Sequence, residues 1–431
     1  MKLSIEKVVY SGAGLARREN ATGAETVFVP FTLPGEVVEA EMGGSRGGIT
    51  EATLTQILTA SPNRIEARCI HFGVCGGCQY QHAAYEAQLE LKRGILKETL
   101  KRAGLHDLPE IETCSAQPWE YRNRIRLRVD RVDSRLRAGY VRRNSGEFLP
   151  IEMCPIAAPV LWRAAQALLE CLDAFPQWAT AIREVEFFAT GNERKLQITL
   201  IVAAQPAKNF EALCAAVQEK TPELAGAGVQ ILQGSTGTRK AQRTKTGAEW
   251  GAEGLSYKVD EESYWVGRGN FFQVNRSLVT QLVRLATEGR GGRLAWDLYA
   301  GVGLFSRVLA RNFDEVVAVE AQKGSLEANL RGPGKRAAAA TTADFLRQAA
   351  LERDRPELIV MDPPRAGVGA EVCSLLARVK APELVYISCD PVTLGRDLRM
   401  MVDSGYKVNQ LHLVDMFPQT FHQETVAVLG R

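Results

Sequence analysis

Two kinds of hydrophobic pattern divide the chain. Near the N-terminus, short segments rich in Val, Ile and Thr are separated by glycine-containing turns. These segments are Ser4–Tyr10, Thr26–Pro30, Val37–Met42 and Thr50–Leu58. From about Tyr257 onward, apolar runs of buried-strand length alternate with helical segments; the runs are Leu294–Leu298, Val316–Val319, Leu358–Met361 and Leu384–Ile387. The first pattern predicts a small barrel, and the second predicts a parallel sheet covered on both faces.

The middle of the chain has a mixed pattern. Residues 83–103 place apolar side chains at helical spacing, whereas Arg122–Val129 alternates arginine with apolar residues, which predicts a strand with one basic face. We therefore expect three domains, residues 1–60, 61–255 and 256–431. The helix predicted within residues 83–105 belongs to the second domain and can pack on the third domain.

Composition narrows the class of protein. The chain has 431 residues, of which 45% are hydrophobic and 24% charged, as in ordinary globular proteins. It has no apolar run of the roughly 20 residues that span a bilayer and no visible secretory signal, so we expect a cytoplasmic protein without membrane partners. The net charge is only +3, but residues 117–144 hold nine arginines against three acids.

A glycine-containing turn follows the first apolar run of the third region. Gly301 and Gly303 permit a tight turn and the close approach of a ligand. Glu320 ends the next apolar run, where an acid can bind ribose hydroxyls. The third glycine of the dinucleotide fingerprint is missing, which disfavours NAD and favours S-adenosylmethionine. The alternative is an ordinary turn with Glu320 facing solvent.

Two further apolar runs end in residues that can do chemistry. Asp362 follows one run and is succeeded by two prolines and Arg365, while Cys389 follows the next run. The carboxyl ends of parallel strands meet at one edge of a sheet, where ligands bind, and an ionised cysteine is a strong nucleophile. The alternatives are a surface turn for Asp362 and a small core residue for Cys389.

The nine cysteines are an odd number, which argues against a disulfide framework in a cytoplasmic protein. Cys69, Cys75, Cys78 and Cys154 form a four-thiolate candidate whose spacing suits zinc or an iron–sulfur cluster. A redox dithiol at Cys75 and Cys78 is disfavoured because no thioredoxin-like pattern surrounds it. The remaining cysteines without partners are Cys114, Cys171, Cys214 and Cys373.

Five motifs occur in an order that closely resembles the RNA uracil-5-methyltransferase family, which uses S-adenosylmethionine. They begin at Asn270 (NFFQVN), Asp297 (DLYAGVG), Asp362 (DPPR), Ser388 (SCDP) and Phe421 (FHQETV). The first 60 residues resemble the RNA-binding TRAM barrel of that family. The resemblance implies a Rossmann-like α/β methyltransferase domain, preceded by an α+β central domain and an N-terminal OB-like barrel.

The resemblance also assigns roles to residues. Cys389 would attack uracil C6 and make C5 nucleophilic, and Glu424 would remove the C5 proton; without the family, Glu424 would pass for an exposed carboxylate. The expected cofactor contacts are Gln273, Tyr299, Gly301, Glu320, Asp344 and Asp362, with Gln273 and Asp362 able to contact the uracil edge instead.

The segment from Cys75 to His82 resembles the [4Fe-4S] motif of the branch that modifies rRNA. This implies a cluster on the four cysteines with a structural or RNA-positioning role, and a uridine of 23S rRNA as the substrate of a monomeric enzyme. The arginines expected to contact RNA phosphates are Arg122, Arg124, Arg126 and Arg128; a solvated face is the alternative. Two other functions stay open: methylation of a tRNA T-loop uridine, and a non-catalytic RNA-binding iron–sulfur protein with decayed motifs.

Overall fold

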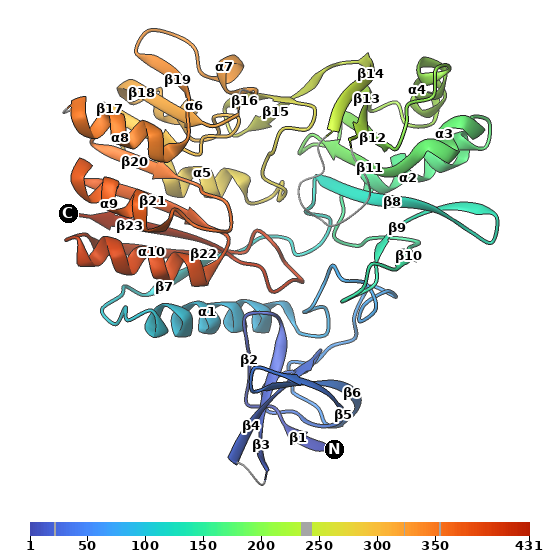
Figure 1. Ribbon diagram of the computed structural model, residues 1–431, viewed down its shortest axis with the longest axis horizontal. Coiled ribbons are helices and arrows are strands. Elements are labelled where there is room, and N and C mark those ends of the chain that lie inside the picture. The colour runs from blue at the N-terminus through green and yellow to red at the C-terminus, as the bar shows by residue number, and fades with distance from the viewer. Residues whose placement is uncertain (21–22, 234–243, 323, 353–354) are drawn as a thin grey trace.

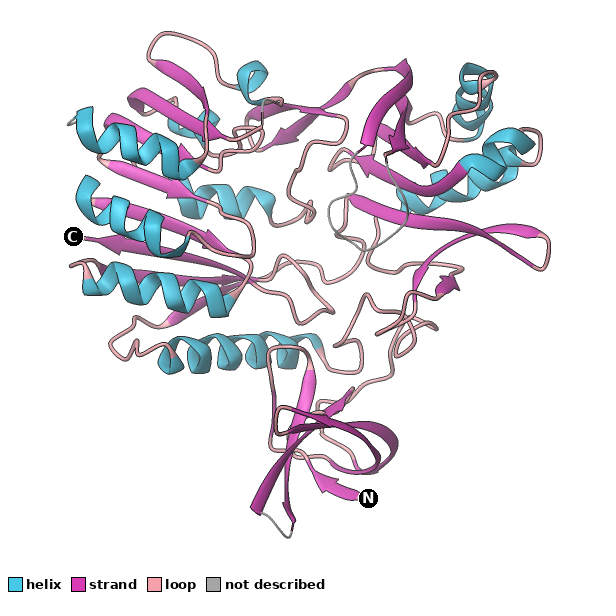
Figure 2. Ribbon diagram, viewed as in Figure 1, coloured by secondary structure: helices cyan, strands magenta, loops and turns pink. Residues whose placement is uncertain are grey.

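The computed structural model describes residues 1–20, 23–233, 244–322, 324–352 and 355–431. Three groups of strands are visible in Figure 1: a barrel-like group at the bottom, a twisted sheet at the right and a large sheet at the left. Helices accompany the two larger sheets but not the barrel (Figure 2). Within the described ranges, every helix is too short or too polar to cross a membrane.

The N-terminal strands form a curled half-barrel. Its strand order is β1-β5-β6-β4-β3-β2. The strands are β1 (Lys2–Ser4), β2 (Lys7–Val8), β3 (Ala13–Asn20), β4 (Gly23–Pro30), β5 (Val37–Arg46) and β6 (Ile49–Thr59). The predicted run Ser4–Tyr10 is therefore two short strands, because Ile5 and Glu6 leave the ladder. Val27, Val29 and Val38 lie fully buried in the small core.

The central sheet has seven strands in the order β10-β9-β8-β11-β12-β13-β14. They are β8 (Arg124–Val132), β9 (Arg135–Val141), β10 (Phe148–Pro150), β11 (Ile182–Ala189), β12 (Leu196–Val202), β13 (Leu224–Leu232) and β14 (Thr244–Gly251). The helices α2 (Pro159–Leu172), α3 (Pro176–Ala181) and α4 (Phe210–Lys220) share one apolar core with this sheet. The hairpin β15 (Gly254–Val259) and β16 (Glu262–Gly267) follows it.

The large sheet has eight strands in the order β19-β18-β17-β20-β21-β23-β22-β7. They are β7 (Ile111–Cys114), β17 (Gly292–Leu298), β18 (Phe313–Glu320), β19 (Lys335–Ala339), β20 (Leu358–Met361), β21 (Glu383–Ser388), β22 (Lys407–Val414) and β23 (Glu424–Gly430). β17 to β21 run parallel, whereas β23 runs antiparallel to both of its neighbours. This is the predicted parallel sheet, with the addition of one reversed strand, β23.

Helices cover both faces of the large sheet, which explains why its strands are apolar without alternation. They are α5 (Val279–Thr287), α6 (Ser306–Leu309), α7 (Leu326–Asn329), α8 (Thr342–Glu352), α9 (Gly369–Val379) and α10 (Pro391–Asp403). One face holds a core shared with α8, α9 and α10, and the opposite face holds a core shared with α5 and α6. Trp296 and Ala295, neighbours on β17, point to these two cores respectively.

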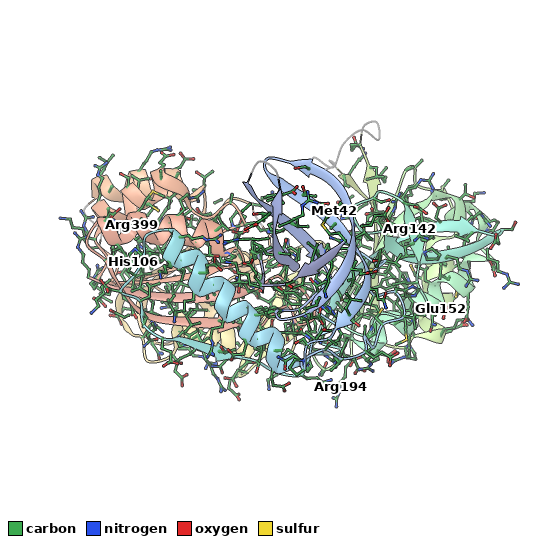
Figure 3. All side chains as sticks on the ribbon, turned by 90° about the horizontal axis from the view of Figure 1, so that it is seen from below. Met42, His106, Arg142, Glu152, Arg194 and Arg399 are labelled. Atoms are coloured by element: carbon green, nitrogen blue, oxygen red, sulfur yellow. The ribbon has the colours of Figure 1, made fainter. Side chains whose placement is uncertain are left out.

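The predicted helix after the cysteine-rich loop is α1 (Tyr85–Arg102). Leu96 and Leu100 bury in the same core as Leu394 and Leu398 of α10, so α1 packs on the large sheet. Seen from below, α1 crosses under that sheet, and the half-barrel lies over the junction of the two larger parts (Figure 3).

Candidate active site

The reversed strand β23 brings two predicted site residues together. β23 begins at the edge where the parallel strand β21 ends. In the antiparallel pairing of these strands, Ser388 lies opposite Thr425. Cys389 directly follows Ser388, and Glu424 directly precedes Thr425, so the next opposed pair at this edge is Cys389 and Glu424. The two predicted catalytic residues are therefore neighbours in space.

Carboxyl groups crowd this edge of the sheet. Glu424 is buried, and its Oε1 has no hydrogen-bond partner among the described residues. Asp362 lies after β20 and accepts a hydrogen bond from the Gln273 side-chain amide at 3.1 Å. Burial, with the charge of nearby Asp297, raises the pKa of Asp362 to about 7. Burial and Asp362 also raise the pKa of Glu424 well above its ordinary value.

The thiol of Cys389 is half-buried beside these acids. Burial, followed by the charges of Glu424 and Asp362, raises its pKa to about 12, while the Arg365 guanidinium acts in the opposite direction. The carboxyls and the thiol all resist ionisation in this site. A positive charge brought close to them would favour their ionised forms, so the edge suits a cationic ligand.

The glycine turn after β17 is open to a ligand. Tyr299, Gly301 and Gly303 all have positive φ angles, of 62°, 56° and 86°. A Cβ added at Gly301 would meet no atom within 4 Å, so the backbone is accessible there. The Gly301 N–H donates to the Glu320 carboxylate at 2.9 Å, which fixes this acid beside the turn. The turn and Glu320 can therefore receive a nucleoside, as S-adenosylmethionine requires.

Asp344 is placed differently. It lies exposed in the first turn of α8, where it accepts a hydrogen bond from Thr341 at 2.6 Å and pairs with Arg347 at 2.5 Å. α8 follows β19, so Asp344 is on the same edge of the sheet, but its carboxylate is already engaged by these two neighbours.

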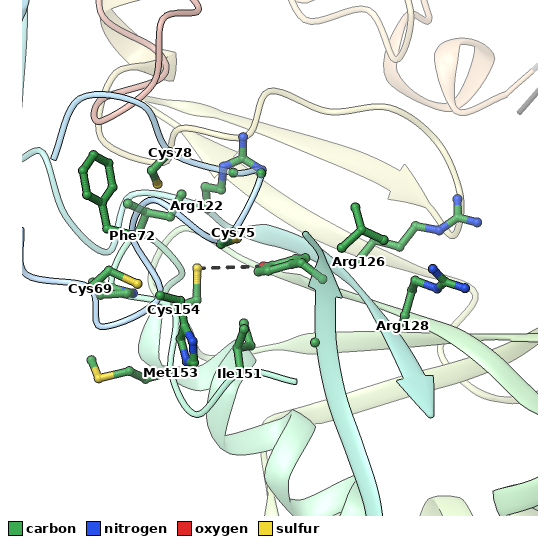
Figure 4. A pocket seen from close by; sticks show the side chains of 18 of the residues that line it. Cys69, Phe72, Cys75, Cys78, Arg122, Arg126, Arg128, Ile151, Met153 and Cys154 are labelled. Carbon is green, nitrogen blue, oxygen red and sulfur yellow. Dashed lines mark hydrogen bonds between the residues drawn. The ribbon is translucent and has the colours of Figure 1, made fainter. Parts of the chain in front are cut away.

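The four candidate cluster cysteines line one cavity of about 620 Å³. Figure 4 shows Cys69, Cys75, Cys78 and Cys154 around it. All four thiols are free, and the Tyr140 hydroxyl contacts the Cys154 sulfur at 3.8 Å. Burial and the neighbouring thiols Cys154 and Cys75 raise the pKa of Cys78 to about 12. Within the described part of the chain, no group of three or more His, Cys, Asp or Glu side chains is arranged to hold a metal ion.

The basic face of β8 has acidic partners that the sequence window did not include. Arg124 pairs with Glu186 at 3.4 Å and lies over the Phe188 ring, and Arg126 pairs with Glu184. The predicted basic face is therefore neutralised at these two arginines, because the acids come from the adjacent strand β11.

The other two arginines of the set differ from each other. Arg122 lines the cysteine cavity, whereas Arg128 donates to the Gly146 carbonyl at 2.8 Å near the rim of the same cavity. The alternating acids Glu184 and Glu186, within an otherwise apolar run, were the signal that could have identified the partners of β8.

Sequence reasoning missed three residues of the active-site edge. Asp297 is fully buried and accepts hydrogen bonds from the Ser306 backbone and hydroxyl. A charged residue inside an apolar run was its signal. Arg365 supplies the cation that faces Cys389. Tyr10, from the half-barrel, donates to Asp390 beside Cys389 at 3.2 Å, and no local pattern announces it.

Comparison with known proteins gives this geometry a context. The family model described as tRNA (Uracil-5-)-methyltransferase matches residues 84–352 and 335–431. A 23S rRNA (uracil(1939)-C(5))-methyltransferase RlmD of Pseudomonas entomophila is 34% identical, with 99% of this chain and 93% of that protein covered. An uncharacterized RNA methyltransferase of Aquifex aeolicus is 31% identical over 100% of this chain and 98% of its own.

A solved structure has the same fold from end to end. The tRNA (uracil-54, C5)-methyltransferase of Pyrococcus abyssi, in complex with S-adenosyl-L-homocysteine, superimposes with a TM-score of 0.76. The match covers 100% of both chains at 22% sequence identity and confirms the predicted fold class. The chain therefore belongs to the tRNA (uracil-5-)-methyltransferase family and is an S-adenosylmethionine-dependent enzyme that methylates uracil C5 in RNA.

Proposed function

We propose that this enzyme methylates a uridine of 23S rRNA, with Cys389 as nucleophile and Glu424 as base. The observation that carries the catalytic assignment is the β21–β23 register, in which Ser388 opposes Thr425 and leaves Cys389 beside Glu424. A nucleophile and a base adjacent at a sheet edge are what a two-stage substitution at neighbouring ring atoms needs.

The first stage falls to Cys389. Uracil C5 is a poor nucleophile, so the Cys389 thiolate adds to C6 and the electrons of the C5–C6 bond move into an enolate. Arg365 favours the thiolate, while burial and the carboxyls oppose it. Bound S-adenosylmethionine supplies an electrophilic methyl group and a positive sulfonium charge.

The second stage falls to Glu424. Once C5 carries the methyl group, its proton must leave as the C5–C6 double bond re-forms and the Cys389 thiolate departs. A carboxylate whose pKa is raised by burial is a stronger base than an exposed one, so burial suits Glu424 to this transfer. Its Oε1, which lacks a partner among the described residues, is available to accept the proton.

Several side chains would hold the cofactor and the target uracil. Glu320, fixed by Gly301, would accept hydrogen bonds from the ribose hydroxyls, with Tyr299 beside them. The Asp362–Gln273 pair would face the sulfonium or the uracil edge. Asp344 would turn toward the adenine only by leaving Thr341 and Arg347.

We further propose a [4Fe-4S] cluster on Cys69, Cys75, Cys78 and Cys154. The shared cavity of about 620 Å³ and the four free thiols support it. In such a cluster four iron atoms separate the ligand sulfurs, so they stand farther apart than around a single zinc ion. Methyl transfer involves no oxidation or reduction, so the role of the cluster would be structural or RNA-positioning.

The preference for rRNA rests on relatives. Two RlmD enzymes are 34% and 32% identical over 99% and 100% of this chain, whereas the tRNA enzyme of Pyrococcus abyssi is 22% identical. The target base must leave its stack to reach Cys389, which favours a loop or bulge. The half-barrel, as a TRAM domain, and Arg128 of β8 would contact RNA phosphates. The enzyme is still predicted to be a cytoplasmic monomer.

The test is methylation of separately purified 23S rRNA and tRNA from cells that lack the gene. We expect 5-methyluridine to form in 23S rRNA, and no product with Cys389→Ala. Cys373→Ala, which changes a buried cysteine of α9, is the matched control and should remain active. Methylation of tRNA alone would support the T-loop alternative, and activity of Cys389→Ala would refute the nucleophile.

A further inference from the structure

The turn between β2 and β3 carries the half-barrel into the active-site edge. Gly12 has a φ of +83°, and a Cβ there would come within 2.8 Å of the Gln79 side chain and 3.5 Å of Phe421. A side chain at this position would therefore force the turn away. The Tyr10 ring packs edge-on against Phe421, with ring centroids 5.4 Å apart and an interplanar angle of 84°.

Both loops that carry the proposed catalytic residues meet Tyr10. Its hydroxyl donates to Asp390 Oδ2 at 3.2 Å, and Asp390 directly follows Cys389. Its ring touches Phe421, three residues before Glu424. Tyr10 thus connects the β21–α10 loop to the loop that precedes β23.

Asp390 links Tyr10 to the loop that carries Cys389. Its Oδ1 caps α10 by accepting hydrogen bonds from the Val392 and Thr393 amides at 3.0 and 3.1 Å. Its Oδ2 faces Tyr10 at 3.2 Å and Arg365 at 4.0 Å. Both oxygens are therefore occupied, which fixes the residue next to Cys389. Burial and Asp390 raise the pKa of Tyr10 to about 12, although Arg365, which also contacts the Tyr10 hydroxyl, acts in the opposite direction, so this hydroxyl stays a donor to Asp390.

We propose that Tyr10 of the N-terminal half-barrel is a positioning residue for the catalytic loop, holding Asp390 so that Arg365 stays directed at Cys389. The proposal rests on the nucleophilic role of Cys389 given above. Without the Tyr10 hydroxyl, Arg365 is the remaining donor at Asp390 Oδ2, and its guanidinium closes on that oxygen and leaves the thiol. The half-barrel then contributes to catalysis as well as to RNA contact.

The test compares Tyr10→Phe with Lys7→Met. The first variant keeps the ring against Phe421 and removes only the hydroxyl. The second breaks a different contact of the half-barrel, the 2.5 Å ion pair of Lys7 with Glu98 on α1, which lies outside the catalytic loops. Single-turnover methyl transfer and affinity are measured with 23S rRNA from cells that lack the gene. Alkylation of Cys389 by iodoacetamide is measured without RNA.

For Tyr10→Phe we expect methyl transfer to slow about 10-fold, as for loss of a hydrogen bond to a charged group. Alkylation of Cys389 at neutral pH should slow as well, while RNA affinity changes less than about 2-fold. A merely structural role of Tyr10 would not produce slower alkylation together with unchanged RNA affinity. Lys7→Met should transfer methyl at close to the wild-type rate. Asp390→Asn keeps the helix cap; if Tyr10 acts through Asp390, adding Tyr10→Phe to it should slow transfer little further.

Three results would contradict the inference in different ways. A Tyr10→Phe enzyme as fast as wild type, with Cys389→Ala inactive, overturns the positioning role and leaves the proposed function intact. Methyl transfer by Cys389→Ala would refute the nucleophile, and the inference would fall with it. Equal slowing by Lys7→Met would show that docking of the half-barrel, and not the Tyr10 hydroxyl, is what matters.

Discussion

Cys389 and the four cysteines of the cavity are all free thiols, but their neighbours differ in kind. Cys389 faces two carboxyls, Glu424 and Asp362, and one cation. The cavity cysteines face one another, together with Arg122 and Tyr140. A single thiol beside a base suits covalent chemistry, whereas a set of thiols around a space suits a polynuclear cluster. Under the proposed function, the surroundings of these thiols, more than the residue type, distinguish their roles.

The largest effect should follow from removing the base beside Cys389. Glu424→Gln should lower turnover by about 10²- to 10⁴-fold, the usual range for loss of a positioned acid or base. Because C5 is methylated before the proton leaves, the variant should accumulate RNA bound covalently to Cys389. Transfer of labelled methyl into a denaturation-resistant complex measures this. Glu112→Gln, at an exposed acid of β7, is the control and should turn over normally. Rapid turnover without such a complex would exclude Glu424 as the base.

The next effect separates the two kinds of thiol. Cys154→Ser should lower the iron content from about four atoms per chain to near zero and the free energy of unfolding by a few kcal/mol, since a bound cluster stabilises the fold. Cys114→Ser, a half-buried thiol outside the cavity, should change neither. Iron and sulfide analysis and denaturant unfolding measure both. Wild-type enzyme purified without oxygen that contains no iron would contradict the cluster.

A smaller effect concerns the pH dependence of ligand affinity, which the carboxyl group of Asp362 near Cys389 should control. Asp362, with a pKa raised to about 7 mainly by burial, is neutral below that pH and ionised above it. S-adenosylmethionine carries a positive sulfur and S-adenosylhomocysteine does not. The affinity for S-adenosylmethionine, divided by that for S-adenosylhomocysteine, should therefore rise as pH increases through 7. The rise should be about 10-fold for each unit by which the cation lowers the pKa of Asp362. Calorimetry with both ligands measures this ratio.

The Gln273 amide favours the ionised form of Asp362, so Gln273→Leu should move the midpoint of this change to higher pH. A ratio that stays constant with pH would show that Asp362 does not face the sulfonium.

The smallest effect is expected at the rim of the cysteine cavity. Arg128→Ala should weaken RNA binding a few-fold for all sequences alike and reduce the slope of log affinity against log salt by about 1. Arg124→Ala should leave that slope unchanged, because Arg124 is held between Glu186 and Phe188. Titrations at several salt concentrations measure both. An equal loss of slope in the two variants would mean that the ion pairs of β8 open when RNA binds.

The sequence predicts the large sheet well because its strands are continuous apolar runs. Leu358–Met361 is β20 as predicted, and the runs at 294–298 and 384–387 lie within β17 and β21. The strand ends that carry Asp362 and Cys389 are therefore predictable too. The central arginines are less so, because their partners Glu184 and Glu186 depend on which strand lies next to β8.

Contacts between distant segments could not be read from the chain. Glu424 reaches Cys389 only because β23 is reversed, and nothing local in residues 424–430 encodes that direction. Tyr10 and Asp390 are 380 residues apart, and their hydrogen bond depends on where the half-barrel docks. The buried pair of Lys92 with Asp415, which fixes α1 to the end of β22, was missed for the same reason.

The central claim is that Cys389 bonds to the target base with Glu424 beside it. The most direct measurement is mass spectrometry of the wild-type enzyme after reaction with S-adenosylmethionine and 23S rRNA containing 5-fluorouridine, whose C5 has no proton for Glu424 to remove. We predict a single peptide, containing Cys389, that carries a methylated fluorouridine nucleotide. An adduct at another residue, or methylated RNA with no adduct at Cys389, would contradict the account.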